Sequence, residues 1–295
     1  MARRMLQIAL VAAVLGGGHG AAPAQQPVEE EDEDEGAPSE EPALEPQPGP
    51  TLRAGGFAVL ASLQLGTSKG GKAFEPISIA PDAFYGVNDR LELGIVTSWY
   101  GITGFWSGAL LGFAPSGLCV SHKTNAAGVG CPKRFDNVGG EAHYGLMREG
   151  AFQMAAGGGL IATSFDPFTL DLKLGVHGRW RAGRVGLSFA PSLFIGVTQR
   201  HDPPDGTSNK EAIQLPVEVT FALLPQLLVG LQSGVRGPLD GFSNGYSIPA
   251  ALGATYLVNR QIMVGGAFSF ERVAGGDDLD AGDLRSMTLF GGYMM

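Results

Sequence analysis

The alternation of large apolar residues with small or polar residues, at a period of two, constrains the fold of this chain more than any other feature. It recurs from about residue 52 to residue 295; in the stretch 184–198, Val185 and Leu187 share one face and Gly186 and Ser188 the other. Successive side chains of a β-strand point to opposite faces. A strand that is apolar on one side and small or polar on the other suits a wall between lipid and a polar interior. Because only helices and closed barrels satisfy every backbone hydrogen bond inside a bilayer, the alternation predicts a transmembrane β-barrel.

The predicted fold class is all-β, an antiparallel up-and-down barrel of about 12 strands, with 10 or 14 as alternatives. The expected strands are residues 54–65, 76–87, 91–100, 136–147, 151–163, 168–180, 184–198, 212–222, 226–236, 246–257, 261–271 and 285–294. Short and mostly longer connectors alternate between them, as expected when tight turns face the periplasm and long loops face outward. The longest connector, 101–135, is predicted either to fold into the barrel mouth or to project as a hairpin.

Aromatic residues near the predicted strand ends indicate interfacial girdles, because their rings are apolar and the tips of Tyr and Trp are polar. The alternative is that they are scattered without forming a girdle. These residues are Tyr85, Trp99, Tyr144, Trp180, Tyr256 and Tyr293.

The N-terminus differs from the rest of the chain in composition. Residues 1–24 are predicted to be a secretory signal peptide, with Arg3 and Arg4 before an apolar run and Ala22-Pro23-Ala24 as the cleavage site. The alternative is an N-terminal anchor, but the apolar run is shorter than the roughly 20 residues that span a bilayer as a helix. Residues 25–52 are predicted to be a disordered, acidic, Pro/Glu-rich periplasmic linker, and residues 53–295 the barrel.

Charge in this sequence is concentrated in the linker, where residues 29–35 are all acidic. Such a run repels itself and is typical of a solvated spacer, although weak binding of a basic partner or of calcium is an alternative. The remaining domain is close to neutral, which gives no indication of nucleic-acid binding.

The two cysteines, Cys119 and Cys131, both lie in the longest connector. Export makes a disulfide permissible, and this pair would close the loop upon itself. A metal site with His122 is the alternative, but no fourth ligand is evident. The sequence therefore favours a disulfide, and it implies no metal and no cofactor.

Two hairpin-like stretches carry a resemblance to a known class. Residues 85–95, Tyr-Gly-Val-Asn-Asp-Arg-Leu-Glu-Leu-Gly-Ile, and the similar stretch 248–265 resemble the strand–turn–strand hairpins of Gram-negative outer-membrane barrels. The resemblance is greatest to small porin-like barrels grouped with putative transporters of the phenol-degradation MetA-pathway type. It implies an outer-membrane barrel that passes small solutes.

The C-terminal strand 287–295 is similar to the signal by which the barrel-assembly machinery recognises its substrates. It alternates apolar residues and has Tyr293 third from the end, but it finishes on Met295 where that signal usually has an aromatic residue. The resemblance thus implies outer-membrane lipid and the assembly machinery as partners.

The candidate functional residues are charged side chains that the alternation places on the interior face. Charged groups facing lipid cost up to roughly 2–4 kcal/mol for Arg or Lys at the bilayer midplane, so an inward assignment is favoured. The candidates are Glu92, Glu141, His143, Asp171, Lys173, His177, Arg179, Glu218, Arg236 and Glu271. They either line a water-filled pathway, or pair with one another, as Lys173 or Arg179 with Glu141, and fill the interior.

Other motifs give weaker indications of function. The stretch 66–72 fits G-x-x-x-x-G-K, but Ala73 follows where a phosphate loop needs Ser or Thr. The aspartates of 277–283 do not have the spacing of an EF-hand. No serine, histidine and acid stand at a spacing that we recognise as a catalytic set. The predicted function is therefore a channel, with a closed structural or interaction barrel as the alternative and a phospholipase- or protease-like enzyme third.

Overall fold

The computed structural model describes residues 49–67, 77–97, 118–120, 138–165, 168–200, 209–276 and 285–295. Residues 44–295 form one compact unit. The predicted signal peptide and most of the predicted linker lie outside the described residues, as do Trp99, Cys131 and most of the connector 101–135. In the described ranges no helix has the length and apolar character needed to cross a membrane.

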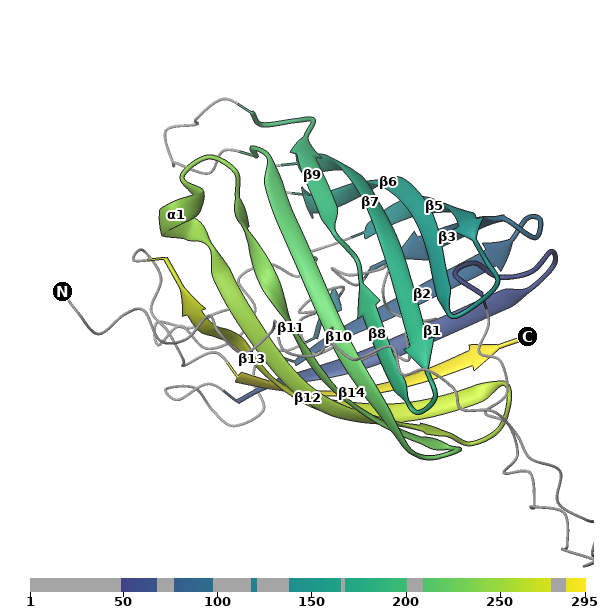
Figure 1. The fold of residues 1–295 in the computed structure, drawn as a ribbon. Helices are drawn as coiled ribbons and strands as arrows, with labels where there is room; N and C mark the ends of the chain where they lie inside the picture. The colour runs from purple at the N-terminus through teal and green to yellow at the C-terminus, as the bar shows by residue number, and fades with distance from the viewer. Residues whose placement is uncertain are drawn as a thin grey trace, which may run out of the picture. The chain divides into compact units, whose positions relative to one another are not determined.

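The strands form a closed antiparallel barrel (Figure 1). They are β1 (Phe57–Gly66), β2 (Ile77–Gly86), β3 (Leu91–Val96), β4 (Leu118–Cys119), β5 (Val138–Met147), β6 (Phe152–Phe165), β7 (Phe168–Ala182), β8 (Val185–Phe189), β9 (Ser192–Gly196), β10 (Ala212–Leu224), β11 (Leu227–Pro238), β12 (Ser247–Leu257), β13 (Ile262–Gly275) and β14 (Arg285–Met294), with one short helix, α1 (Phe242–Gly245). Strand β1 pairs with both β2 and β14, which closes the sheet on itself.

Twelve strand positions surround the barrel, which confirms the predicted count. The two-residue β4 pairs with β2 beyond the part of β2 that pairs with β3. Strands β8 and β9 both lie between β7 and β10 and are two pieces of one crossing. The predicted uninterrupted strand 184–198 is wrong in this detail: the ladder breaks at Ala190 and Pro191, because proline has no N–H to donate to it.

Short turns join the strands at one end of the barrel, which we call the short-turn end. Two of them are built alike: Asn88 Oδ1 accepts hydrogen bonds from the backbone N–H groups of Arg90 and Leu91, both at 2.8 Å. Asn259 Oδ1 does the same for Gln261 and Ile262, at 2.7 and 2.8 Å. An asparagine that bonds its own backbone two residues on favours a tight turn, which explains the likeness between the two hairpin stretches.

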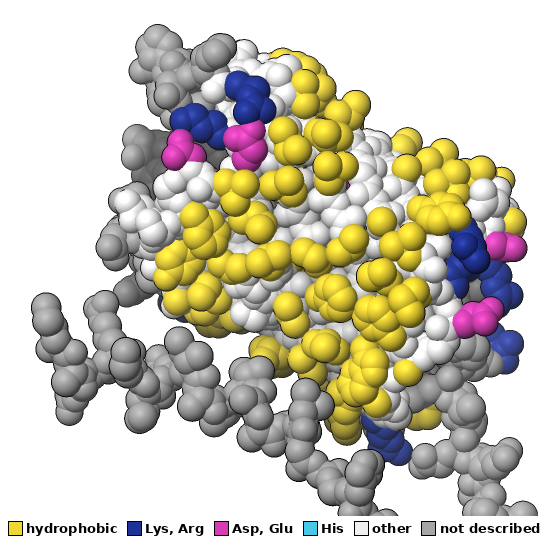
Figure 2. Space-filling view, turned by 45° about the horizontal axis from the view of Figure 1, so that its top comes forward, with side chains coloured by type: hydrophobic (Ala, Val, Ile, Leu, Met, Phe, Trp, Pro, Cys, Tyr) yellow, Lys and Arg dark blue, Asp and Glu magenta, His cyan; other side chains and the backbone are white. Residues whose placement is uncertain are grey.

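The wall has an apolar outside and a polar inside. Leu93, Ile95, Leu231 and Leu252 are among many large hydrophobic side chains exposed on the strands, while alternate positions are buried. Figure 2 shows hydrophobic side chains spread over the face of the wall, with charged side chains gathered toward its edges. This is the reverse of a water-soluble protein and matches a barrel surrounded by lipid.

Five of the six predicted girdle aromatics are described, and all five stand near the short-turn end of their strands. Each is exposed on the outer face, so they form a girdle at this end. They are Tyr85 of β2, Tyr144 of β5, Trp180 of β7, Tyr256 of β12 and Tyr293 of β14.

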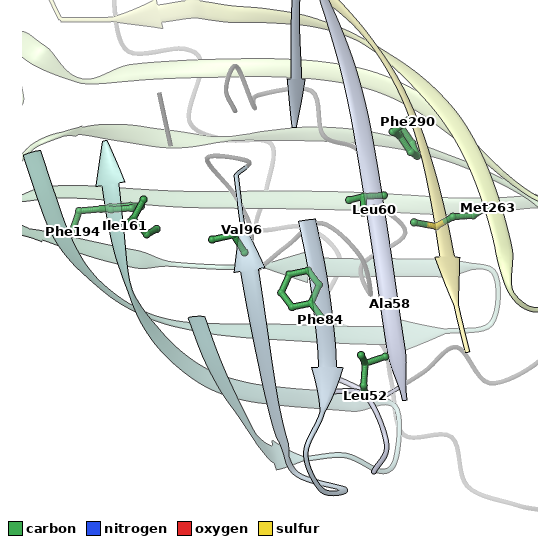
Figure 3. Packing of buried hydrophobic residues seen from close by; sticks show 9 residues of the cluster. All are labelled: Leu52, Ala58, Leu60, Phe84, Val96, Ile161, Phe194, Met263 and Phe290. Atoms are coloured by element: carbon green, nitrogen blue, oxygen red, sulfur yellow. The ribbon is translucent and has the colours of Figure 1, made fainter. Parts of the chain in front are cut away.

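A group of apolar side chains is buried within the barrel (Figure 3). Leu60, Phe84 and Phe290 belong to β1, β2 and β14, and Leu52 joins them from the segment that precedes β1. Thr51 and Leu52, which the sequence assigns to the linker, are 2% and 6% exposed. The backbone N–H of Leu52 donates to Glu92 Oε2 at 2.8 Å, so the packed structure begins before residue 53.

Candidate functional site

Four of the predicted residues meet inside the barrel: Glu92 of β3, Glu141 and His143 of β5, and Lys173 of β7. We call them the charged cluster. His143 Nδ1 lies 3.0 Å from Glu92 Oε1, and His143 Nε2 lies 3.0 Å from Glu141 Oε2. Lys173 Nζ donates to Glu141 Oε1 at 2.8 Å. The pairing of Lys173 with Glu141, which the sequence allows, is therefore present.

Strand register explains how these side chains reach one another. Glu92 and His143 are direct partners on β3 and β5. Glu141 and Lys173 belong to strands that do not pair, and Gly159 of β6 lies between them in the same row. A β-carbon on Gly159 would lie 2.7 Å from Glu141 Cγ, so only glycine leaves space for the glutamate to cross β6 and reach Lys173.

A second glycine leaves space for the ring of His143. Gly157 is the β6 partner of His143, and a β-carbon there would lie 2.5 Å from His143 Cδ2. The His143 ring lies 5.4 Å, centroid to centroid, from the ring of His177 and 5.9 Å from that of Phe84. The imidazole is thus fixed by carboxylates at both nitrogens and by two rings.

The charged cluster has equal numbers of positive and negative groups and is buried from solvent. Lys173 and His143 are 0% and 1% exposed. With both glutamates ionised, each ring nitrogen of His143 faces an acceptor, so both are donors and the imidazole is positively charged. Two cations then face two anions, which offsets the large cost of burying each charge alone.

The other predicted residues are distributed along the inner wall. Thr163 Oγ1 donates to Asp171 Oδ2 at 3.2 Å, and Arg236 Nε donates to Ser247 Oγ at 3.2 Å. Arg179 donates to Gln153 Oε1, and Glu218 is buried on β10. The β12–β13 register shifts near Glu271, whose side chain lies outside the described residues, and neighbouring Arg272 is buried there. Cys119 lies in β4, but Cys131 lies outside the described residues, so the disulfide between them stays a prediction.

Uncharged polar residues that we did not predict line another part of the inner wall, on β1, β13 and β14. Gln64 Nε2 of β1 donates to Ser286 Oγ of β14 at 2.8 Å, and Ser286 Oγ lies 2.7 Å from Ser269 Oγ of β13. We call Gln64, Ser269 and Ser286 the hydroxyl row. Its members share the interior parity of their strands, but small polar residues at such positions give a weaker signal than charged ones.

Comparisons with known proteins bear on the fold. Neither a model of a known protein family nor a curated protein sequence matches the chain. Among solved structures, a NanC porin is 9% identical with a TM-score of 0.53, and the match covers 80% of this chain and 98% of that one. This likeness shows a shared porin-like barrel fold.

Two further structures align over similar lengths at lower scores. A KdgM porin is 8% identical with a TM-score of 0.47, covering 80% of this chain and 98% of that one. The COG4313 outer membrane channel from Pseudomonas putida F1 is 10% identical with a TM-score of 0.48, covering 83% and 97%.

Proposed function

We propose that this chain is an outer-membrane channel for small solutes. The observation that carries the proposal is the distribution of polarity: charged and hydroxyl side chains are buried on the inside of a closed barrel whose outside is apolar. A barrel with this distribution offers polar solutes a route that avoids lipid. The porin-like fold supports the same function.

The remaining sequence predictions complete this proposal. Residues 1–24 direct export, and the linker that begins at residue 25 lies in the periplasm as far as Thr51 and Leu52, which pack in the barrel. Strand 287–295 is recognised by the barrel-assembly machinery of a Gram-negative cell. Outer-membrane lipid contacts the apolar wall. Membership of the phenol-degradation MetA-pathway type rests on the hairpin resemblance alone, and the transported solute is not specified by it.

The experiment that tests the channel begins with folding. Heat-modifiable gel mobility identifies the folded barrel, and the refolded protein is then added to a planar bilayer. We expect discrete conductance steps that grow with salt concentration. A folded barrel that never conducts would overturn the channel proposal.

A pair of neighbouring variants locates the pathway. Glu218 lies on the inner face of β10 and Val219 on its outer face. Glu218→Gln removes a negative charge from the interior, so the reversal potential in a salt gradient should shift toward anions. Val219→Thr, the matched control, should leave it unchanged. Equal reversal potentials for both variants and the original chain would remove Glu218 from the pathway.

A closed barrel is the second candidate function, and the charged cluster favours it. Lys173, His143 and Glu141 satisfy one another and exclude solvent, and Leu52 bonds to Glu92 at the same level. In that case the barrel acts as a structural or interaction protein. The conductance experiment separates the two candidates, because only the channel gives current steps.

A further inference from the structure

Three arginines line one small pocket at the short-turn end of β7, β8 and β10. Arg179 and Arg181 belong to β7, and Arg184 stands in the turn between β7 and β8. Ser188 and Thr220 add hydroxyl groups to its wall. Among the described residues that line the pocket, none is acidic.

Two glycines are among the residues that line the pocket. Gly186 pairs with Arg181 on one side and with Thr220 on the other, and a β-carbon there would lie 2.4 Å from Thr220 Oγ1. Gly183 adopts a φ of 54°, a left-handed conformation that favours glycine, and so allows the tight turn. The carbonyl of Arg184 accepts a hydrogen bond from Ala222 N at 2.8 Å, which holds that turn against β10.

The charges around this pocket are unequal. Arg179 is 5% exposed, and Arg181 follows two residues later on the same strand, so the two like charges repel each other. Arg179 donates to Gln153 Oε1. Glu218 of β10, the partner of Ser188, is not among the residues that line the pocket. The lining residues therefore bring three guanidinium groups and no carboxylate to the pocket.

The geometry points to an anion-binding site in this pocket, which takes the phosphate or carboxylate group of a small solute. Guanidinium groups present forked donors that match the oxygens of such groups, and charge-assisted bonds of this kind are the strong ones. Ser188 and Thr220 supply further donors. The inference deepens the proposed function, since a solute reaches the pocket through the interior of the channel.

Calorimetric titration of the full, folded chain in an uncharged detergent with inorganic phosphate tests the site. Wild type should bind phosphate saturably. Arg181→Gln combined with Arg184→Gln removes two exposed or half-exposed charges without disturbing buried Arg179, and should weaken binding by about tenfold or more. Arg90→Gln, which removes a charge from another short turn, is the matched control and should stay within about twofold of wild type.

Two results would overturn the site: no saturable phosphate binding by a barrel that shows heat-modifiable mobility, or equal weakening by the control and the double variant. The titration does not require the barrel to conduct, so the anion site and the channel can be disproved independently. A barrel that binds phosphate but never conducts keeps the site and loses the channel. A barrel that conducts but does not bind phosphate keeps the channel and loses the site.

A lipid arm identifies the source of the anionic group. The titration is repeated in nanodiscs of phosphatidylcholine with and without phosphatidylglycerol. If phosphatidylglycerol leaves phosphate binding unchanged, the site takes a soluble anion, as proposed. If phosphatidylglycerol competes with phosphate in wild type, the pocket holds a lipid headgroup, and the assignment of a solute is overturned while the anion chemistry stands.

Discussion

The two inner walls of this barrel bury polar groups in different ways. The charged cluster spans β3, β5 and β7, and its long side chains reach across the intervening β6. The hydroxyl row lies on the adjacent strands β13, β14 and β1, where short side chains bond directly to neighbours. One wall buries full charges and the other buries dipoles.

The difference shows what each kind of group requires of the backbone. Ser269 and Ser286 are direct partners in the β13–β14 ladder and need no extra space. Glu141 and Lys173 need Gly159 between them, and His143 needs Gly157. In this barrel, each of these buried charged side chains depends on a partner and on a glycine beside it, whereas the buried hydroxyls depend only on a hydrogen-bonding neighbour. The following predictions test that contrast, from the largest expected effect to the smallest.

Removing the lysine of the charged cluster should have the largest effect. Lys173→Met leaves Glu141 buried with one partner fewer, and breaking a buried ion pair in this way costs about 3–5 kcal/mol of unfolding free energy. Urea unfolding followed by heat-modifiable mobility measures it. Glu141→Gln with Lys173→Met removes both charges and should recover part of the loss. If the double variant loses more unfolding free energy than the two single variants together, the pairing is contradicted.

Adding a side chain at Gly159 should have the second-largest effect on the unfolding free energy. A β-carbon on Gly159 would lie 2.3 Å from the backbone oxygen of Gly140, which cannot move aside as a side chain can. We expect Gly159→Val to lower the unfolding free energy by about 3 kcal/mol, the upper part of the range for overpacking. Gly140→Val is the control, because its nearest contact is Gly94 O at 3.9 Å. Equal midpoints for the two variants would show that the crossing needs no empty position.

The hydroxyl row should be less sensitive. Ser286→Ala removes a hydroxyl that contacts both Gln64 and Ser269, and a neutral hydrogen-bond loss of this kind costs about 1 kcal/mol. The same urea titration measures it, with Ser243→Ala in the exposed helix α1 as the control. A loss as large as that of Lys173→Met would remove the distinction between the two walls.

An exposed ion pair should show the smallest effect. Arg200 donates to Glu211 Oε1 outside the strands. The pKa of Glu211 is lowered by a hydrogen bond from its own backbone and by Arg200. A lowered pKa contributes stability above the unfolded pKa, and that contribution disappears as pH falls through the folded pKa. Glu211→Gln should therefore differ slightly from wild type at neutral pH, and the difference should shrink as the pH falls below the ordinary pKa of a glutamate. A difference that grows on acidification would contradict this sign.

The interior face of the barrel was largely predictable, because a period of two assigns a face wherever a strand is regular. Glu141, His143 and Lys173 are buried where the alternation places them. The sequence offered Lys173 or Arg179 as the partner of Glu141 and did not choose between them, since the Glu141–Lys173 contact depends on the register of β5, β6 and β7. A sequence gives parity within a strand but not the offset between strands.

Irregular positions account for most of the remainder. Pro191 divides one predicted strand, and the register shift between β12 and β13 accompanies the burial of Arg272, which we did not predict. Leu52 was assigned to the linker because it follows a Pro/Glu-rich stretch, yet Glu92 of β3 binds its N–H. Composition describes a segment on average and cannot identify the residue at which packing begins.

The pairing of the first strand with the last has a consequence for the order of synthesis. Phe57 and Met295 exchange two backbone hydrogen bonds, Phe57 N to Met295 O at 3.0 Å and Met295 N to Phe57 O at 2.9 Å. Strand β1 leaves the ribosome early but lacks one of its two neighbours until β14 has been made. A chain cut short by a few strands would expose two unpaired edges, which favour aggregation. The barrel can therefore close only after β14, its last strand, has been made.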